Sequence, residues 1–262
     1  MINVENKAEG LMTFGGHLDV LRQMLFRIVV VFIVLSVIIF SFKEETFSFL
    51  LAPRECDFIT YRLIGKLAHW IGLDFHLTQF SVDLISTDLS AQFMAHLSTS
   101  CMLGLLVSSP YIVYELFRFI SPALYENEKK YSVVITVAVY GLFIIGLLVC
   151  YYIIFPISFQ FLATYEVDPS VKSTITLASY LDTFTSLTFL MGIVFQLPIL
   201  VFFLEKMGLV DALLLSRYRR YAIILIMVVA AIITPPDLFT MFIVTLPMWL
   251  LYEMSIWVIR MK

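Results

Sequence analysis

Charged side chains are scarce in this chain, and six long stretches contain no Asp, Glu, Lys or Arg. Only 14% of the 262 residues are charged, 61% are hydrophobic, and the mean hydropathy is +0.95. A soluble domain of this size cannot bury so much apolar surface, so the composition predicts a membrane protein that crosses the bilayer several times. The uncharged stretches are residues 28–42, 89–114, 131–165, 183–204, 221–236 and 238–252.

Cysteine and histidine are also rare. The three cysteines (Cys56, Cys101 and Cys150) and the four histidines lack the spacing of metal ligands. The chain has no Gly-x-Ser-x-Gly elbow, no His-Glu-x-x-His, no Cys-x-x-Cys and no Gly-rich phosphate loop. We therefore expect no metal, no cofactor and no disulfide framework, and we expect that the protein is not an enzyme.

The uncharged stretches predict helices, because only helices and closed barrels satisfy every backbone polar group in lipid and no period-2 alternation is present. We expect an all-α polytopic membrane protein in which residues 1–262 form a single domain. A short amphipathic helix is expected near residues 62–71 of a long outer loop. The six predicted spans are residues 22–43, 90–119, 131–160, 180–205, 221–236 and 238–258, and the outer loop covers residues 44–89.

The basic residues predict the orientation of these spans. With the N-terminus inside, twelve of the seventeen Lys and Arg residues lie on the cytoplasmic side, and most of the other five lie in the long first loop. Long loops count weakly in the positive-inside rule. An even number of spans then places both termini in the cytoplasm.

The fifth predicted span is short. Its sixteen residues end at Pro235 and Pro236, and as a helix they cover about 24 Å of a hydrocarbon core that is about 30 Å thick. Asp237 completes a turn that is too short for a loop domain. We therefore expect a tight, short hairpin of the last two helices, with a locally thin bilayer around it.

Three polar residues in or beside the spans are functional candidates, because such side chains need partners inside the protein. Gln196, two residues before Pro198, either contacts a partner molecule or joins helices within the chain. Glu115 either has a function or forms an ion pair with Arg118. Glu253 lies near the inner end of the last helix, where snorkelling to the interface explains it equally well.

Two cytoplasmic segments carry acidic residues. Asp19 lies just before the first span, followed by Arg22, and Glu126 and Glu128 lie between the second and third spans. These segments are either ordinary solvated loops or an acidic surface that accepts a basic peptide.

Several motifs, in order, resemble the TatC family, the multi-spanning receptor subunits of the twin-arginine protein translocase. The resemblance covers nearly the whole chain except the outer loop. The matching residues are Phe14, His17-Leu18-x-x-Leu21-Arg22, Phe117-x-Phe119-Ile120-x-Pro122-Ala123-Leu124-Tyr125-x-x-Glu128-Lys129-Lys130, Phe155-Pro156, Ala178-Ser179-Tyr180, Gly192-x-x-Phe195-Gln196-x-Pro198, Arg219-x-Tyr221-Ala222, Thr234-Pro235-Pro236-Asp237, Pro247 and Leu251-Tyr252-Glu253.

The resemblance implies a non-enzymatic receptor in the bacterial cytoplasmic (inner) membrane, shaped like a glove with a concave wall. Such a receptor binds the Arg-Arg signal peptides of folded cargo, works with single-span TatA and TatB-type subunits in an oligomer, and depends on the proton-motive force. No nucleic acid partner is implied.

The resemblance also assigns roles to residues. Glu128 matches one of two signal-peptide glutamates. The other position is Val20 here, and the nearest carboxylate is that of Asp19, one residue earlier. Gln196 fits a position on the concave face that carries Glu or Gln in the family. Arg22 and Glu126 complete the predicted signal-peptide site, and Pro53, Pro122, Pro198, Pro235, Pro236 and Asp237 are predicted structural positions.

The alternative function is a small-solute secondary transporter. Transporters of that class usually show internal repeats and charged sites at the membrane midplane, and we find neither in this sequence. The composition and the motifs therefore favour the receptor.

The charge distribution predicts the topology directly. Single cysteines at residues 127 and 214 should resist a membrane-impermeant thiol reagent added from outside, because both lie in predicted cytoplasmic loops. Labelling of either site in intact cells would overturn the N-in, C-in orientation.

Overall fold

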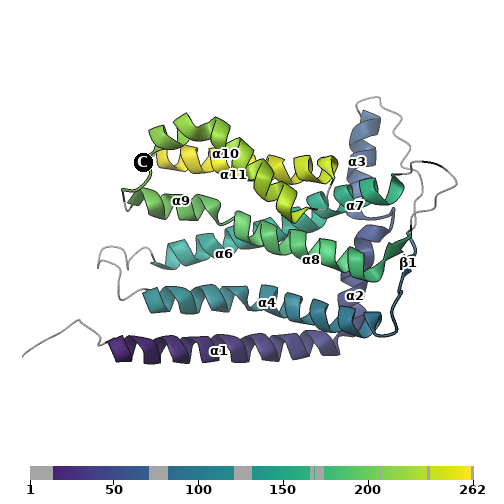
Figure 1. The fold of residues 1–262 in the computed structure, drawn as a ribbon, viewed down its shortest axis with the longest axis horizontal. Helices are drawn as coiled ribbons and strands as arrows, with labels where there is room; N and C mark the ends of the chain where they lie inside the picture. The colour runs from purple at the N-terminus through teal and green to yellow at the C-terminus, as the bar shows by residue number, and fades with distance from the viewer. Residues whose placement is uncertain are drawn as a thin grey trace, which may run out of the picture.

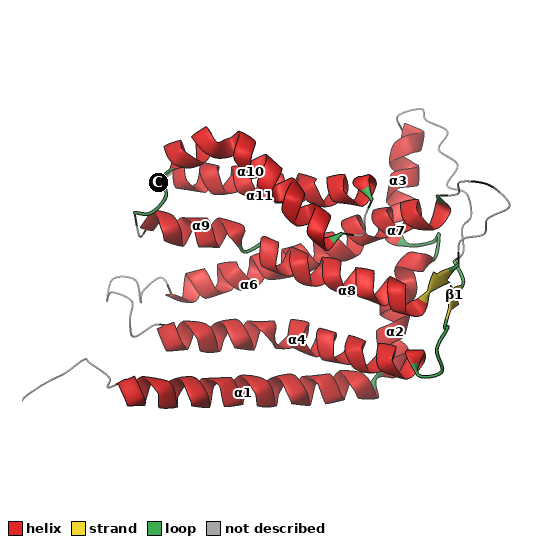
Figure 2. Ribbon diagram, in the orientation of Figure 1, coloured by secondary structure: helices red, strands yellow, loops and turns green. Residues whose placement is uncertain are grey.

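The computed structural model describes residues 14–70, 82–120, 132–165, 168, 174–206, 208–234 and 237–260. This part of the chain is almost wholly helical, which confirms the all-α prediction (Figure 2). The long helices lie roughly parallel and side by side, and α2 and α3 run across one end of the bundle (Figure 1). The elements are α1 (Phe14–Ser41), α2 (Lys43–Leu51), η1 (Ala52–Arg54), α3 (Ile59–Trp70), β1 (Leu84–Ile85), α4 (Ala91–Ile120), α6 (Ser132–Val149), η3 (Cys150–Ile154), α7 (Phe155–Thr164), β2 (Ile175–Thr176), α8 (Leu177–Val194), α9 (Leu197–Lys206), α10 (Ala212–Ile233) and α11 (Leu238–Arg260).

Five helical segments of the described residues are long and apolar enough to cross a membrane, so the protein is a multi-pass membrane protein. The fifth predicted span, residues 221–236, corresponds to α10, whose first half carries Arg217, Arg219 and Arg220, and α10 does not meet the same criterion. The five segments are Leu18–Ser41, Ala91–Leu116, Val137–Thr164, Leu177–Lys206 and Leu238–Arg260.

Helices α1 and α4 pack against each other along much of their length. At Gly104 the backbones approach so closely that an added Cβ would lie 2.1 Å from Ser36 Oγ and 2.9 Å from Ser36 Cα. Small residues allow such contacts between membrane helices, where apolar side chains gain little by leaving lipid. Gly104 therefore fixes how closely the first two spans approach each other.

The residues predicted as the outer loop 44–89 contain more structure than expected. Helix α2 directly follows α1, the predicted amphipathic helix is present as α3, and β1 pairs in parallel with β2 in the register Leu84↔Ile175. The sequence did not predict α2, because a nine-residue helix with Glu44 and Glu45 in its first turn shows no long apolar pattern.

Buried tyrosines attach this end segment to the bundle. The Tyr151 hydroxyl donates to the carbonyl of Phe49 at 2.7 Å, and the Tyr180 hydroxyl donates to the carbonyl of Leu50 at 2.8 Å. Both carbonyls belong to the last turn of α2, where carbonyls lose their usual intrahelical partners, although that of Phe49 also accepts from the N–H of Ala52. The bonds therefore satisfy the end of α2 and join it to η3 and α8, where the hydrophobic core lies.

Tyr61 of α3 makes a second attachment. Its hydroxyl lies 2.9 Å from the carbonyl oxygens of both Pro53 and Pro156, and its single proton serves one of them at a time. Burial raises the pKa of Tyr61 above its usual range, so the hydroxyl stays a donor at physiological pH. The predicted structural residue Pro53 is itself buried.

Two predicted single helices are interrupted. The third span contains the π-helical segment η3 just before Pro156, and the fourth span breaks between α8 and α9 at Phe195 and Gln196, just before Pro198. Proline has no N–H, so it leaves the carbonyl four residues earlier without a helical partner. For Pro156 that carbonyl belongs to Tyr152, and it accepts a hydrogen bond from the Thr60 hydroxyl.

The last two helices form the predicted hairpin, but their lengths need correction. Helix α10 begins nine residues before the predicted start and has 22 residues, and α11 has 23. Only the uncharged part of α10, residues 221–233, is short at thirteen residues. The prediction failed because it equated the uncharged run with the helix, whereas Asp211 caps α10 earlier by accepting from the N–H of Leu214 at 2.6 Å.

Candidate functional site

The first candidate surface lies at the start of α1. Asp19 and Arg22 are exposed there, and with Gln23, Phe26 and Arg27 they line a groove of about 560 Å³. Residues 19, 22, 23, 26 and 27 fall on one face of a helix with 3.6 residues per turn. The groove therefore presents one carboxylate, two guanidinium groups and an aromatic ring on one face of α1.

Glu126, Glu128 and Pro122 lie outside the described residues. The helices that flank their segment are described: α4 ends at Ile120 and α6 begins at Ser132. Both of these helix ends lie at the same end of the bundle as the start of α1 (Figure 1). The fold thus brings the attachment points of this segment to the end of the bundle that carries Asp19.

Glu115 is the most buried charged residue among those described, with a side-chain exposure of 3%. Its Oε2 accepts from Arg27 Nη2 at 2.9 Å, and its Oε1 accepts from the Tyr111 hydroxyl at 3.1 Å. The predicted partner Arg118 is present but farther away, with 3.8 Å between Nη1 and Oε1. Glu115 therefore mainly joins α4 to α1.

Sequence analysis missed Arg27 and Tyr111. A usable signal was present, because Arg27 directly precedes the first uncharged stretch and Glu115 directly follows the second. Antiparallel neighbouring helices place these two positions at the same depth. The intramembrane pair was overlooked because only pairs within one helix were compared.

Gln196 lies in the break between α8 and α9 rather than inside a continuous helix. Its Nε2 donates to the carbonyl of Val139 in α6 at 3.2 Å and to the carbonyl of Gly192 at 3.4 Å. Among the described residues its buried Oε1 has no hydrogen-bond partner. The side chain thus joins helices through one end of its amide and keeps an acceptor at the other end.

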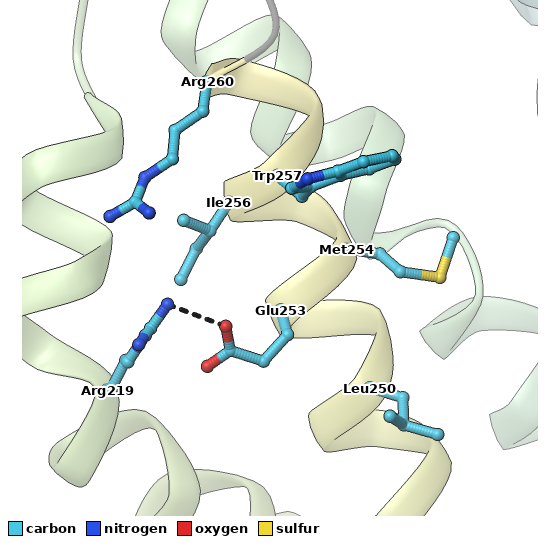
Figure 3. A pocket seen from close by; sticks show the side chains of 7 residues that line it. All are labelled: Arg219, Leu250, Glu253, Met254, Ile256, Trp257 and Arg260. Carbon is cyan, nitrogen blue, oxygen red and sulfur yellow. Dashed lines mark ion pairs between the residues drawn. The ribbon is translucent and has the colours of Figure 1, made fainter.

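Glu253 pairs with Arg219, and 2.8 Å separate Oε2 from Nη2 (Figure 3). Its side chain is 27% exposed. The neighbouring Tyr252 hydroxyl donates to the carbonyl of Leu215 in α10 at 2.9 Å. Glu253 therefore holds α11 against α10, which the snorkelling interpretation alone did not predict.

The predicted structural residues behave in different ways. Pro198 is buried in the first turn of α9. Asp237 precedes α11, and its Oδ1 accepts from the N–H of Thr240 at 2.6 Å, as in an N-cap. Pro235 and Pro236 lie outside the described residues, so their predicted role stays a prediction.

The described residues define a multi-pass α-helical membrane protein whose groove and interhelical ion pairs lie toward the end of the bundle that carries the start of α1 and the chain's C-terminus. A family model described as "Sec-independent protein translocase protein (TatC)" matches residues 16–247. The chain belongs to the TatC family.

Individual relatives agree with this assignment. A "Sec-independent protein translocase protein TatC" of Blattabacterium sp. subsp. Periplaneta americana is 33% identical over 94% of both chains. One from Helicobacter pylori (strain ATCC 700392 / 26695) is 35% identical over 78% of this chain and 80% of the relative. A crystal structure described as "Twin Arginine Translocase Receptor- TatC" superposes with a TM-score of 0.72 at 29% identity, covering 94% of this chain and 98% of that one.

The Arg27–Glu115 contact generates a stability prediction. Arg27→Gln should lower the free energy of unfolding by about 2 kcal/mol, because the buried carboxylate loses its closest charged donor. Thermal unfolding of the purified protein in detergent measures the effect. Arg22→Gln, an exposed arginine on the same helix, is the control and should unfold at the wild-type temperature. Equal losses in the two variants would contradict the assignment.

Proposed function

We propose that this chain is the receptor of a twin-arginine translocase and binds the Arg-Arg signal peptides of folded precursor proteins. The main supporting observation is that Asp19 lies at the same end of the bundle as the end of α4 and the start of α6, which flank the segment with Glu126 and Glu128. Membership of the TatC family and the likeness to a twin-arginine receptor structure support the proposal.

The chemistry of arginine suits this arrangement. A guanidinium group is planar and offers a fork of N–H donors that matches a carboxylate with two parallel hydrogen bonds, whereas lysine offers only a point charge. Two adjacent arginines need two acceptors at a fixed separation. Glu128 is the proposed principal acceptor, Asp19 the second, and Arg22 and Glu126 border the site.

The Arg27–Glu115 pair supports a fixed separation between the two acceptors. Asp19 lies two helical turns before Arg27 on α1, and Glu115 lies in the last turns of α4, shortly before the segment with Glu128. The pair joins the two helices close to the points where the acceptors are attached. Glu115 and Arg27 are therefore positioning residues for the receptor site.

The remaining parts of the proposal follow from the family and the charge distribution. The receptor sits in the bacterial inner membrane with both termini in the cytoplasm, and α10 is its fifth span and α11 its sixth. It acts without catalysing a reaction itself, assembles with single-span TatA and TatB-type subunits, and depends on the proton-motive force. Its helices form a glove-like bundle with Gln196 on the concave wall.

Replacement of Glu128 tests the receptor site. Glu128→Gln keeps the shape and removes the charge, so it should abolish binding of an Arg-Arg signal peptide while the protein still inserts. A lost charge-assisted contact weakens binding about tenfold to more than a hundredfold. Asp19→Asn should have a smaller effect and Glu126→Gln a minor one. Peptide crosslinking in membranes measures binding, with a Lys-Lys peptide as the control.

Normal binding and export of Arg-Arg cargo by Glu128→Gln would show that this acceptor assignment is wrong. The acidic segment would then be solvated surface.

Replacement of Gln196 tests the concave wall. Gln196→Leu should leave insertion intact but weaken export, because the free acceptor Oε1 serves a partner helix or the signal peptide. The lost bond to Val139 costs only about 1 kcal/mol of stability. Gln196→Glu, which keeps acceptor oxygens, is the matched control and should export better than Gln196→Leu. Export and the thermal unfolding temperature are measured for each variant. Normal export by Gln196→Leu together with a lowered stability would assign Gln196 to internal packing alone.

A further inference from the structure

A pocket of about 330 Å³ is lined by residues of α10 and α11 (Figure 3). It lies toward the end of the bundle that carries the chain's C-terminus (Figure 1). The proposed receptor site does not use it. Its lining includes Arg219 of α10 and, on α11, Leu250, Glu253, Met254, Trp257 and Arg260. These residues separate into a basic part and an apolar part.

The basic part has an excess of positive charge. Arg219 and Arg260 supply two guanidinium groups, and Glu253 supplies one carboxylate, which leaves a net charge of +1. The Arg219–Glu253 contact of 2.8 Å occupies one terminal nitrogen, and Arg260 Nη2 donates to Ser216 Oγ at 2.9 Å. Each guanidinium has five N–H donors, so both keep donors for a further acceptor. Glu253 holds Arg219 at the pocket without neutralising the pair.

The apolar part continues along α11. Leu250, Met254 and Trp257 are 47%, 51% and 62% exposed, so they present an apolar strip beside the guanidinium groups. Trp257 lies about one helical turn before Arg260, the last residue of α11. Tryptophan and arginine at the end of a spanning helix mark the depth of the lipid headgroups. An apolar strip that leads away from this depth lies along lipid acyl chains.

We propose that this pocket binds an anionic phospholipid, with its phosphate at Arg219 and Arg260 and an acyl chain along Leu250 and Met254. Basic pockets between membrane helices are suited to acidic headgroups. The net charge of +1 favours a headgroup with a net negative charge over a zwitterionic one, whose own cation would offset the attraction. The bound lipid would then bridge α10 and α11.

Helix α10 provides a matched control. Arg217 carries the same charge as Arg260 and lies on the same helix as Arg219. It is exposed, but it does not line the pocket. A general attraction of the basic helix for an acidic membrane would depend on Arg217 as much as on Arg260. A specific pocket would depend on Arg260, which lines it, and not on Arg217.

Trp257 is a built-in reporter for the test. The full-length protein with Trp70→Phe and Trp249→Phe retains Trp257 as its only tryptophan. It is reconstituted into phosphatidylcholine vesicles that contain either brominated phosphatidylglycerol or brominated phosphatidylcholine, and quenching of Trp257 gives the relative affinity. We expect a preference for phosphatidylglycerol that falls about fivefold in Arg260→Gln. Arg217→Gln should keep the preference, and Arg260→Lys should restore most of it.

Equal quenching by the two lipids in the parent protein would overturn the proposal. An equal loss in Arg217→Gln and Arg260→Gln would also overturn it, because the attraction would then belong to the whole surface. Inorganic phosphate at about 10 mM, an ordinary buffer concentration, should not relieve quenching by phosphatidylglycerol, because exposed charges bind a free anion only weakly. If it does, the site recognises a free anion and the lipid assignment is wrong. Loss of all quenching upon addition of a single-span partner helix would show that a protein occupies the pocket instead.

Discussion

Lipid solvates apolar side chains about as well as other apolar side chains do, so the hydrophobic effect gives membrane helices little reason to pack sideways. The positions of these helices therefore depend on close backbone contact and on a few polar bonds in a medium of low dielectric constant. Gly104 permits the close contact between α1 and α4. Arg27 and Glu115 add the polar bond, with 2.9 Å between their atoms. An unpaired Glu115 at this depth would be costly, which ties the two helices together.

Two prolines make further polar bonds between helices possible. Pro156 and Pro198 each remove one N–H from a spanning helix, and the backbone near each is irregular. The carbonyl freed by Pro156 accepts from Thr60, and the Pro156 carbonyl lies within reach of Tyr61, so α3 is attached where α6 and α7 meet. The break before Pro198 turns Gln196 toward α6. Interruptions that weaken single helices thus provide the acceptors and donors that join different helices.

Two ion pairs between helices of the described residues lie at different places and have separate consequences. Near the start of α1, the Arg27–Glu115 pair joins α1, which carries Asp19, to α4, which precedes the segment with Glu128. At the other side of the same end, Arg219 and Glu253 hold α10 against α11 and leave a basic pocket beside exposed apolar residues (Figure 3). Binding of a peptide at the first place and of a lipid at the second would use different residues, so each can change without the other.

The sequence by itself determined the class of the protein, because long uncharged stretches can only be helices in lipid, and five of the six expected spans are present. It also carried the motifs from which the TatC family was predicted, and the comparisons confirm that family. Tertiary structure decided what depends on contacts distant in sequence. Glu115 pairs with Arg27, which is 88 residues away in the sequence, more closely than with Arg118. Helix α2 formed where its carbonyls could meet Tyr151 and Tyr180. Such partners cannot be read from local spacing, because they exist only once the helices lie side by side.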